Sequence, residues 1–333
     1  MLYTSDENQG LVKVLQFLKA HRLEYLSGED LSEVLKISRV AIWKHIKKIQ
    51  SLGYKIESKQ NLGYRLIDST NLLLPWEISE GLKTKKLGKK IYYFDVLEST
   101  QNFANGISRK KENFGATVIA ESQTLGKGRQ GREWISPKGG IWLSVILEPE
   151  FDLYKITLIP FAVAVALANA IEKTLRIQTK LKWPNDITLN GKKVAGIIID
   201  ASIESTKIES IVIGVGINFN VNSKKIESKI KKKTNFYGVS SLVNDKKVKP
   251  AVLVKEFFIE LEKILNKLSE NKTNELTNEW IKRSSTIGQT VTVTDTDGKI
   301  TGKAVGLDKD GSLIIKHSGK ITRITSGDII YHK

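Results

Sequence analysis

Two short segments in the middle of the chain hold the residue types that phosphate chemistry needs. The first runs from Gly126 to Arg132, where glycines alternate with Lys127 and Arg129. Glycine lets backbone amides approach an anion closely, and a guanidinium group can bind phosphate oxygens through two parallel hydrogen bonds. The segment therefore predicts a loop that encloses a phosphate chain. The alternative is a basic hairpin tip, which is the commoner role of such a loop when it stands alone.

The same glycine spacing also occurs in dinucleotide-binding folds, where a helix opens at the glycines directly after a strand. Here the expected strand ends at Gln123, and the glycines lead into a turn-rich stretch around Pro137 and then into another strand. A dinucleotide-binding fold is excluded because no helix can begin at these glycines.

The second segment is Lys182-Trp183-Pro184-Asn185-Asp186, at the end of an expected strand. A rigid Trp-Pro corner followed by Asn-Asp would fix one cation and one carboxylate beside each other. Lys182 is then suited to neutralise an α-phosphate, and Asp186 is a candidate Mg²⁺ ligand. Pro-Asn-Asp is also ordinary turn chemistry, which is the structural alternative.

Histidine and thiol chemistry are excluded from this region. The chain has no cysteine, and its four histidines, His21, His45, His317 and His332, lie outside the middle of the sequence. Thiolate nucleophiles, disulfides and Cys-ligated zinc are thereby excluded. The site can then catalyse a reaction only by electrostatics, hydrogen bonding and positioning of the substrate. These are typical of adenylate formation and phosphoryl transfer.

The elements that must position these residues form a mixed α+β region, from 89 to about 285. Apolar patterns predict strands at 91–95, 116–123, 141–147, 195–201 and 210–215, and helices at 99–110, 154–177 and 250–269. Small residues at Gly196, Gly214 and Gly216 permit either close approach of a ligand to the backbone or tight strand packing.

Residues 1–67 predict a winged helix-turn-helix. Two amphipathic helices, the second capped by Ser27, are followed by a tight turn and by a third helix that Ser38 caps. A short hairpin then closes the segment. The third helix is basic and lacks acidic residues, which favours entry into the major groove of DNA. The candidates for base or phosphate contacts are Ser38, Arg39, Trp43, Lys44 and Lys47. The alternative is a solvated lysine face on a protein-binding winged helix.

The rest of the chain consists of a connector and a small β domain. Residues 68–88 contain Pro75 and a lysine cluster and are interpreted as a linker. Residues 286–333 offer short β runs punctuated by Asp-Gly and Ser-Gly turns, which predict an SH3-like barrel.

Composition is consistent with a cytoplasmic protein of two or three domains. The chain has 333 residues, 40% of them apolar, and a formal net charge of +17, which favours polyanionic partners. The most apolar stretch, 157–171, is too short to span a membrane and predicts a buried core helix. Lysine-rich residues between Val221 and Pro250 predict a basic loop, which would cover the ligand or attract an acidic partner.

The motifs GKGRQGREWISPKGG, KWPNDI, GKKVAGIIID and GVGINFN follow an EST segment in this order and resemble the bifunctional biotin protein ligases that also repress the biotin operon. The resemblance covers nearly the whole chain. It implies a class II synthetase-like catalytic domain of the biotin/lipoate ligase type. The implied activity is formation of biotinyl-5′-AMP from biotin and Mg-ATP, followed by transfer of biotin to a lysine of a biotin carboxyl carrier protein domain. It also implies an adenylate-bound homodimer that binds operator DNA.

The resemblance assigns roles to residues that match the motifs. Lys182 and Arg129 would be catalytic. The implied biotin-binding residues are Ser99, Thr100, Gln101, Gln123, Lys127, Gly128, Arg129, Lys182, Gly214 and Gly216. The implied ATP or adenylate residues are Arg129, Arg132, Trp134, Lys182, Asn185, Lys193 and Asn218, with Phe236 or Tyr237 as a candidate to stack on adenine. Two positions depart from the pattern: Lys127 often is Arg in the family, and Gln101 often is Asn.

Two other functions remain open from the sequence. A lipoate or octanoate ligase shares the middle fold by resemblance, but its relatives lack the winged head. A transcription regulator that only senses a ligand would not need the set Arg129, Lys182 and Asp186, because that set neutralises phosphate charge.

Overall fold

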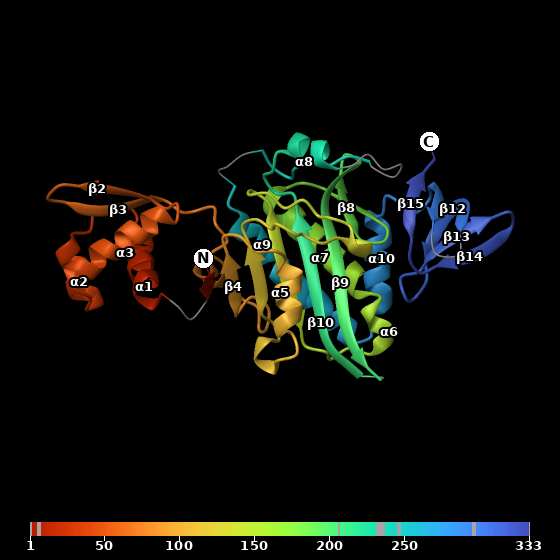
Figure 1. Cartoon of the computed structure of the whole chain (residues 1–333), viewed down its shortest axis with the longest axis horizontal. Helices are drawn as coiled ribbons and strands as arrows, with labels where there is room; N and C mark the ends of the chain where they lie inside the picture. The colour runs from red at the N-terminus through yellow and green to blue at the C-terminus, as the bar shows by residue number, and fades with distance from the viewer. Residues whose placement is uncertain are drawn as a thin grey trace.

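The structure, a computed structural model, describes residues 2–4, 8–205, 207–230, 237–244, 248–294 and 298–332. A helical head, a central α+β body and a C-terminal β-sheet follow one another along the long axis of the molecule (Figure 1). The fold agrees with the predicted class. Part of the expected basic loop, 231–236 and 245–247, lies outside the described residues, and Phe236 is among these. The described part differs from a loop in containing a helix at Ser223–Lys229.

The head is the predicted helix, helix, turn, helix and hairpin. Its elements are α1 (Gln9–Ala20), α2 (Gly28–Leu35), α3 (Arg39–Ser51), β2 (Lys55–Lys59) and β3 (Gly63–Asp68). The Ser27 side chain accepts a hydrogen bond from Asp30 N at 3.0 Å, so the predicted cap of α2 is present. The apolar stripe Ile42, Ile46 and Ile49 of α3 is fully buried, which leaves the opposite face of α3 to solvent.

The first described residues belong to the body, and the sequence did not predict this. Strand β1 (Leu2–Thr4) pairs antiparallel with β4 (Ile91–Phe94) at the edge of the central sheet. Tyr3 is 4% exposed, and its ring meets that of Trp76 edge-on at a centroid distance of 6.0 Å. Lys48 of α3 places its Nζ 5.4 Å from the Tyr3 ring centroid. Residues 2–4 therefore belong to the body, although the head follows them in the sequence.

The stretch interpreted as a linker is folded and packed. Residues Pro75–Ser79 form helix α4, in which Trp76 is only 7% exposed. Trp76 Nε1 donates to the Tyr54 hydroxyl at 2.8 Å, and that hydroxyl donates to Glu77 Oε1 at 2.6 Å. Lys19 of α1 forms an ion pair with Glu77 at 2.7 Å. These contacts fix the head against the body at a second place.

The body is built on one eight-stranded sheet with the order β1-β4-β5-β6-β10-β9-β8-β7. The further strands are β5 (Thr117–Ala120), β6 (Ile141–Leu147), β7 (Lys180–Lys182), β8 (Asp186–Leu189), β9 (Lys192–Glu204) and β10 (Lys207–Ile217). Only the β4–β5 pair is parallel among the strand pairs of the described residues. Strand β6 is buried along its whole length because helices or loops cover both faces of the sheet.

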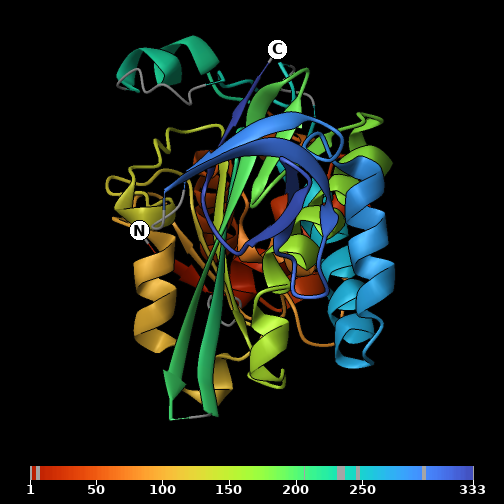
Figure 2. The same ribbon diagram turned by 90° about the vertical axis from the view of Figure 1, so that its right-hand side faces the viewer.

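Helices cover the two faces of this sheet unequally (Figure 2). Helix α5 (Thr100–Ile107) lies on one face, and α7 (Ile159–Leu175), α9 (Pro250–Ser269) and α10 (Thr273–Arg283) lie on the other. Two shorter helices are α6 (Leu153–Ile156) and α8 (Ser223–Lys229). The predicted helix at 154–177 is thus divided into α6 and α7, and α7 is the buried core helix that its apolar composition indicated. No helix among the described residues has the length and apolarity to cross a bilayer.

The C-terminal segment forms a five-stranded antiparallel sheet with the order β14-β13-β12-β11-β15. Its strands are β11 (Thr290–Thr294), β12 (Lys299–Leu307), β13 (Leu313–His317), β14 (Lys320–Ile324) and β15 (Asp328–Tyr331). This domain contacts the end of β7 through Gly311, in the turn between β12 and β13, whose O accepts from Trp183 Nε1 at 3.1 Å. Just before the domain, Ser285 N donates to Leu181 O at 2.8 Å.

Candidate active site

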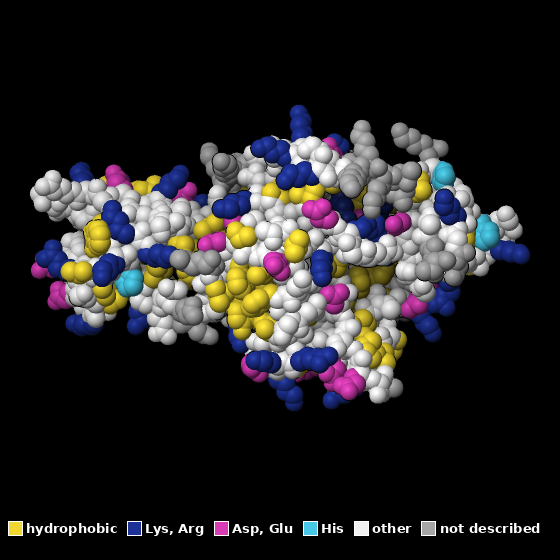
Figure 3. All heavy atoms as spheres, viewed as in Figure 1, with side chains coloured by type: hydrophobic (Ala, Val, Ile, Leu, Met, Phe, Trp, Pro, Cys, Tyr) yellow, Lys and Arg dark blue, Asp and Glu magenta, His cyan; other side chains and the backbone are white. Residues whose placement is uncertain are grey.

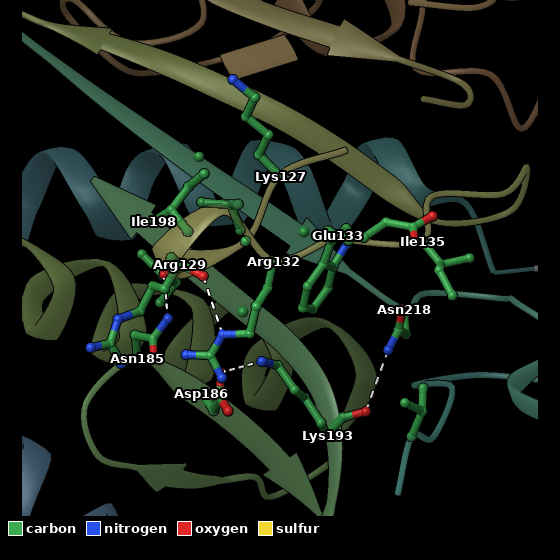
Figure 4. Close-up of a pocket in the computed structure, with 18 of the residues that line it drawn as sticks. Lys127, Arg129, Arg132, Glu133, Ile135, Asn185, Asp186, Lys193, Ile198 and Asn218 are labelled. Atoms are coloured by element: carbon green, nitrogen blue, oxygen red, sulfur yellow. Dashed lines mark hydrogen bonds and ion pairs between the residues drawn. The ribbon is translucent and has the colours of Figure 1, made fainter. Parts of the chain in front are cut away.

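A cavity of about 510 Å³ lies between the glycine-rich loop, the β7–β8 corner and the C-terminal sheet. Apart from Phe236, which lies outside the described residues, every residue predicted for ligand or nucleotide binding, Tyr237 included, lines this one cavity, although these residues come from distant parts of the chain. Besides Tyr237, they are Ser99, Thr100, Gln101, Gln123, Lys127, Gly128, Arg129, Arg132, Trp134, Lys182, Asn185, Asp186, Lys193, Gly214, Gly216 and Asn218. The structure thus brings the predicted set together, and Figure 4 shows part of it.

The glycine-rich loop is a closed hairpin between β5 and β6. Trp134 N donates to Gly126 O at 2.8 Å, and Gly128 N donates to Arg132 O at 2.7 Å. The amide of Gly128 is therefore already paired within the loop, which differs from the expectation of amides free to bind phosphate. The only helical part is a 3₁₀ turn at Arg129–Gly131, consistent with exclusion of a dinucleotide-binding fold.

Lys182 is the last residue of β7, and its side chain lines the cavity. Its side chain is 6% exposed, and Nζ lies 3.3 Å from the ring centroid of Tyr237 and 4.7 Å from that of Tyr331. Burial lowers the pKa of Lys182 to about 8, since a charged ammonium is less stable away from water. Lys182 is thus a buried cation held between aromatic rings.

The neighbouring corner holds an ion pair and a guanidinium. Asp186 pairs with Lys193 Nζ and accepts a short hydrogen bond from the Tyr237 hydroxyl. Arg129 donates to Asn185 Oδ1 at 3.3 Å, and burial lowers the pKa of Arg129 from its ordinary value. The arrangement keeps several cations close together, which suits a polyanionic ligand.

Sequence reasoning missed an acidic residue of this site. Asp328, the first residue of β15, accepts a hydrogen bond from Arg132 at 2.9 Å and lines the cavity. No local signal marks Asp328, because it lies in the C-terminal sheet and reaches the cavity only through docking of that sheet. The C-terminal sheet therefore contributes directly to the cavity wall.

The inner end of the cavity is a network of neutral polar groups. Thr100 N donates to Gln123 Oε1 at 2.7 Å, and Gln123 Nε2 donates to Ser136 Oγ at 2.8 Å. Ser144 Oγ lies 2.9 Å from both Thr100 Oγ1 and Gln101 Oε1. Sequence reasoning did not name Ser144 as a site residue. It is the one polar residue in the apolar sequence of β6, and this could have marked it as a residue of the cavity.

Gln101, one of the two departures from the family pattern, is buried beside this network. Its Nε2 donates to Asp200 at 3.0 Å and to Val212 O at 3.1 Å. Helix α5 begins at Thr100 and Asn102 is exposed, so Asn102 does not take the place of Gln101. Gln101 therefore supports the cavity wall with an amide whose two ends are both engaged.

Glycines of β10 are required by close side-chain packing over the strand. A Cβ at Gly214 would lie 2.5 Å from Gln101 Oε1, and a Cβ at Gly216 would lie 2.5 Å from Trp134 Nε1. The Trp134 indole thus lies directly on the strand, where Lys193 Nζ is 4.9 Å from its ring centroid. Trp134 provides a flat aromatic surface inside the cavity.

Lys127, the other departure, contributes differently from Arg129. Its side chain is exposed and extends away from the cluster of Asn185, Asp186 and Lys193 (Figure 4). Asn218 instead adjoins that cluster through the backbone, because its Nδ2 donates to Lys193 O at 3.4 Å.

A resident metal site is not formed by the side chains present. The described residues contain no group of three or more metal-ligating acidic, histidine or cysteine side chains. Asp186 is a single carboxylate that Lys193 and Tyr237 already engage. A Mg²⁺ ion would need the phosphate oxygens of a nucleotide as its main ligands.

The five residues predicted to contact DNA share the exposed face of α3 or its start. They are Ser38, Arg39, Trp43, Lys44 and Lys47. Ser38 Oγ accepts from Ala41 N at 3.3 Å, so Ser38 caps the helix. Trp43 is 51% exposed and lies 6.0 Å from Lys47 Nζ. The basic side chains of the head are visible at its surface in Figure 3.

Comparison with known protein families gives a match to each of the three parts. Residues 93–218 match the biotin/lipoate A/B protein ligase family, residues 11–65 match an HTH domain, and residues 286–331 match the biotin protein ligase C-terminal domain.

Individual relatives match over most of the chain. The bifunctional ligase/repressor BirA of Bacillus spizizenii is 35% identical over 307 residues, which is 92% of this chain and 94% of that protein. The protein of the same name from Escherichia coli is 28% identical, over 92% of both chains. The structure of biotin protein ligase from Aquifex aeolicus in complex with biotin and ATP is 26% identical, with a TM-score of 0.59, and covers 73% of this chain and 98% of that one.

Proposed function

The chain belongs to the biotin/lipoate A/B protein ligase family, and on that premise we propose that it is a biotin protein ligase with a DNA-binding repressor head. It uses ATP to form biotinyl-5′-AMP and transfers biotin to a lysine of a biotin carboxyl carrier protein domain. The observation that supports this function is that a single cavity is lined by the cations Lys182, Arg129 and Arg132 and, at its other end, by neutral polar side chains.

Adenylate formation joins a carboxylate to the α-phosphate. The biotin carboxylate attacks the α-phosphorus of Mg-ATP, a P–O bond forms, and pyrophosphate leaves. We assign Lys182 to the oxygens on which negative charge increases, and Arg129 and Arg132 to the phosphate chain. The Trp134 ring offers a surface for adenine. Thr100, Gln101 and Gln123 line the end proposed for the biotin ring, where Thr100 and Gln123 are hydrogen-bonded to one another. Asp186 would be the side-chain ligand of a Mg²⁺ ion bound by the phosphates of ATP.

The second step is acyl transfer to a carrier. The neutral amine of the carrier lysine attacks the carbonyl carbon of the mixed anhydride, and AMP leaves with the C–O bond electrons. The amine loses a proton to solvent or buffer, so the products are a biotinyl amide and AMP.

A lipoate ligase and a ligand sensor without catalysis remain as alternatives. One assay separates them from the proposal: the protein is incubated with ATP, a carrier domain, and either biotin or lipoate, and the carrier is weighed by mass spectrometry. We expect a mass increase with biotin only. An increase with lipoate alone, or none with either acid, would contradict biotin ligation.

The pKa of Lys182 predicts how adenylate formation depends on pH. Burial lowers this pKa to about 8, and the ammonium form is the one that stabilises phosphate charge. The charged form is complete below that pKa and is lost as pH rises through it. We expect kcat/KM for ATP to fall about tenfold for each pH unit above this value. The measurement is pyrophosphate release against pH, with circular dichroism as a check on folding. A profile that stays level through this range would contradict the assignment.

The head binds operator DNA through α3, and the adenylate-bound enzyme acts as a homodimer in this proposal. Two copies of a winged head match a two-fold operator, because half-site spacing follows protein symmetry. Sedimentation of the protein with and without biotin and ATP tests the dimer, and we expect the heavier species only with both ligands.

Lys44 is exposed on α3 and is expected to contact a DNA phosphate. Replacing Lys44 by alanine should weaken operator binding at low salt and reduce the slope of log affinity against log salt by about 1. The measurement is fluorescence anisotropy with the chain's own operon promoter at several salt concentrations. The matched control is Lys309→Ala, which removes the same charge from an exposed site in the turn between β12 and β13. An equal change in slope for both variants would argue against a DNA-binding role for α3.

The substrates also indicate where the protein works. ATP, a carboxylase carrier domain and operator DNA occur together in the cytoplasm, and we propose that location.

A further inference from the structure

We propose that Tyr331, the last residue of β15, is a positioning residue that holds the Lys182 ammonium at the site of α-phosphate activation. The inference rests on the proposed ligase function, because Lys182 has that task only in adenylate formation. The Tyr331 ring centroid lies 4.7 Å from Lys182 Nζ, and the Tyr237 ring centroid lies 3.3 Å from the same atom. The ammonium therefore contacts two aromatic rings from different parts of the chain.

The Tyr331 ring is fixed by a hydrogen bond next to Lys182. The Tyr331 hydroxyl and Thr286 Oγ1 are 2.9 Å apart, and Thr286 Oγ1 also accepts from Trp183 N at 3.1 Å. Thr286 is fully buried. Trp183 directly follows Lys182 in the chain. The Tyr331 ring is therefore held, through Thr286, by the same stretch of backbone that carries Lys182.

Both neighbours of Lys182 in the chain are also held, one by Ser285 just before the C-terminal segment and the other by Gly311 within it. Ser285 N donates to Leu181 O at 2.8 Å, and Trp183 Nε1 donates to Gly311 O at 3.1 Å. These contacts set the position of the Lys182 main chain, but they leave the flexible side chain free to turn. Fixing a lysine side chain costs conformational entropy. A ring at the tip of the side chain offsets part of that cost before the substrate arrives.

A ring has an advantage over a carboxylate at this position. Among the described residues, Lys193 pairs with Asp186 and Arg132 pairs with Asp328, but no ion pair involves Lys182. An aromatic face attracts an ammonium without carrying a formal charge. The positive charge of Lys182 is therefore held in place and stays available to phosphate oxygens.

The first test is a double-mutant cycle in the full-length enzyme. Tyr331→Leu is expected to lower the single-turnover rate constant of biotinyl-AMP formation about tenfold, since one cation–π contact is lost. The KM for biotin should not change, and Tyr331→Phe should recover most of the lost rate because the ring is restored. In the Lys182→Ala background, Tyr331→Leu should cause no further loss. Equal losses in the two backgrounds would overturn the proposal and make Tyr331 a structural residue.

The matched control is Tyr154→Leu. Tyr154 is 58% exposed, and its ring centroid lies 5.7 Å from Lys155 Nζ, so it forms the same kind of pair outside the cavity. This variant should leave the rate unchanged. A wild-type enzyme that makes no biotinyl-AMP would overturn the proposed function together with this inference. A wild-type enzyme that makes it, with an equally fast Tyr331→Leu variant, overturns this inference alone.

A second test keeps the shape of the ring, because leucine at position 331 can also displace the C-terminal sheet. Phenylalanine with an increasing number of ring fluorines is incorporated at position 331. Fluorine withdraws charge from the ring face and weakens cation–π attraction while packing is retained. We expect the rate constant to fall with each fluorine at an unchanged Tm. A rate constant that stays the same across the fluorinated variants, at an unchanged Tm, would overturn the proposal.

Discussion

Replacing Lys182 by alanine is expected to slow biotinyl-AMP formation by about 10³-fold, which is the usual effect of removing one preorganised group that stabilises transition-state charge. The ammonium is buried at the cavity wall, and alanine leaves no other cation at that position. Single-turnover formation of radiolabelled biotinyl-AMP at saturating biotin and ATP measures the loss. Transfer from chemically prepared biotinyl-AMP to a carrier tests whether the second step also needs Lys182.

The control for this substitution is Lys180→Ala. Lys180 lies on the same strand, β7, but it is exposed, so its removal changes the net charge equally without altering the cavity. We expect its rate to match that of wild type. Normal single-turnover synthesis by Lys182→Ala, with an intact unfolding transition, would show that Lys182 is not catalytic and would remove the central element of the mechanism.

Replacing Gly216 by alanine is expected to raise the KM for ATP by about 10- to 100-fold, because overpacking costs about 1–3 kcal/mol. The new Cβ would lie 2.5 Å from Trp134 Nε1, so the indole must leave the surface of β10. Since Trp134 is the proposed surface for adenine, nucleotide binding should suffer more than biotin binding. Initial rates of pyrophosphate release over a range of ATP and biotin concentrations separate the two effects.

Gly106→Ala is the matched control, because a Cβ at Gly106 in α5 would meet nothing within 4 Å. Alanine also favours a helix over glycine there. Its KM values should equal those of wild type. If Gly216→Ala instead raised the KM for biotin and left that for ATP unchanged, Trp134 would have to be assigned to the biotin end of the cavity.

The C-terminal sheet has a direct part in these expectations. It supplies Asp328, which engages Arg132 at 2.9 Å, and Tyr331, which contacts Lys182. One outer nitrogen of Arg132 is engaged by this ion pair. The sheet therefore contributes to the cavity wall and contacts two of its cations.

The sequence alone was sufficient for features that depend on nearby residues. The cap at Ser27, the order of elements in the head and the apolar helix at 159–175 follow from short-range spacing, because caps and amphipathic periods involve residues a few positions apart. The residues of the two basic motifs line one cavity, as their expected common role requires. The domain boundaries and the individual ligand contacts remain predictions.

The tertiary structure decided the contacts that join distant segments. Arg132 and Asp328 are 196 positions apart, and no local pattern relates them. Strand β1 joins the central sheet because β4 offers an unpaired edge, and the stretch expected to be a linker packs because Trp76 finds a buried place between head and body. Which side chains meet across such distances depends on how complete elements pack, and packing is a property of the whole fold that local spacing does not contain.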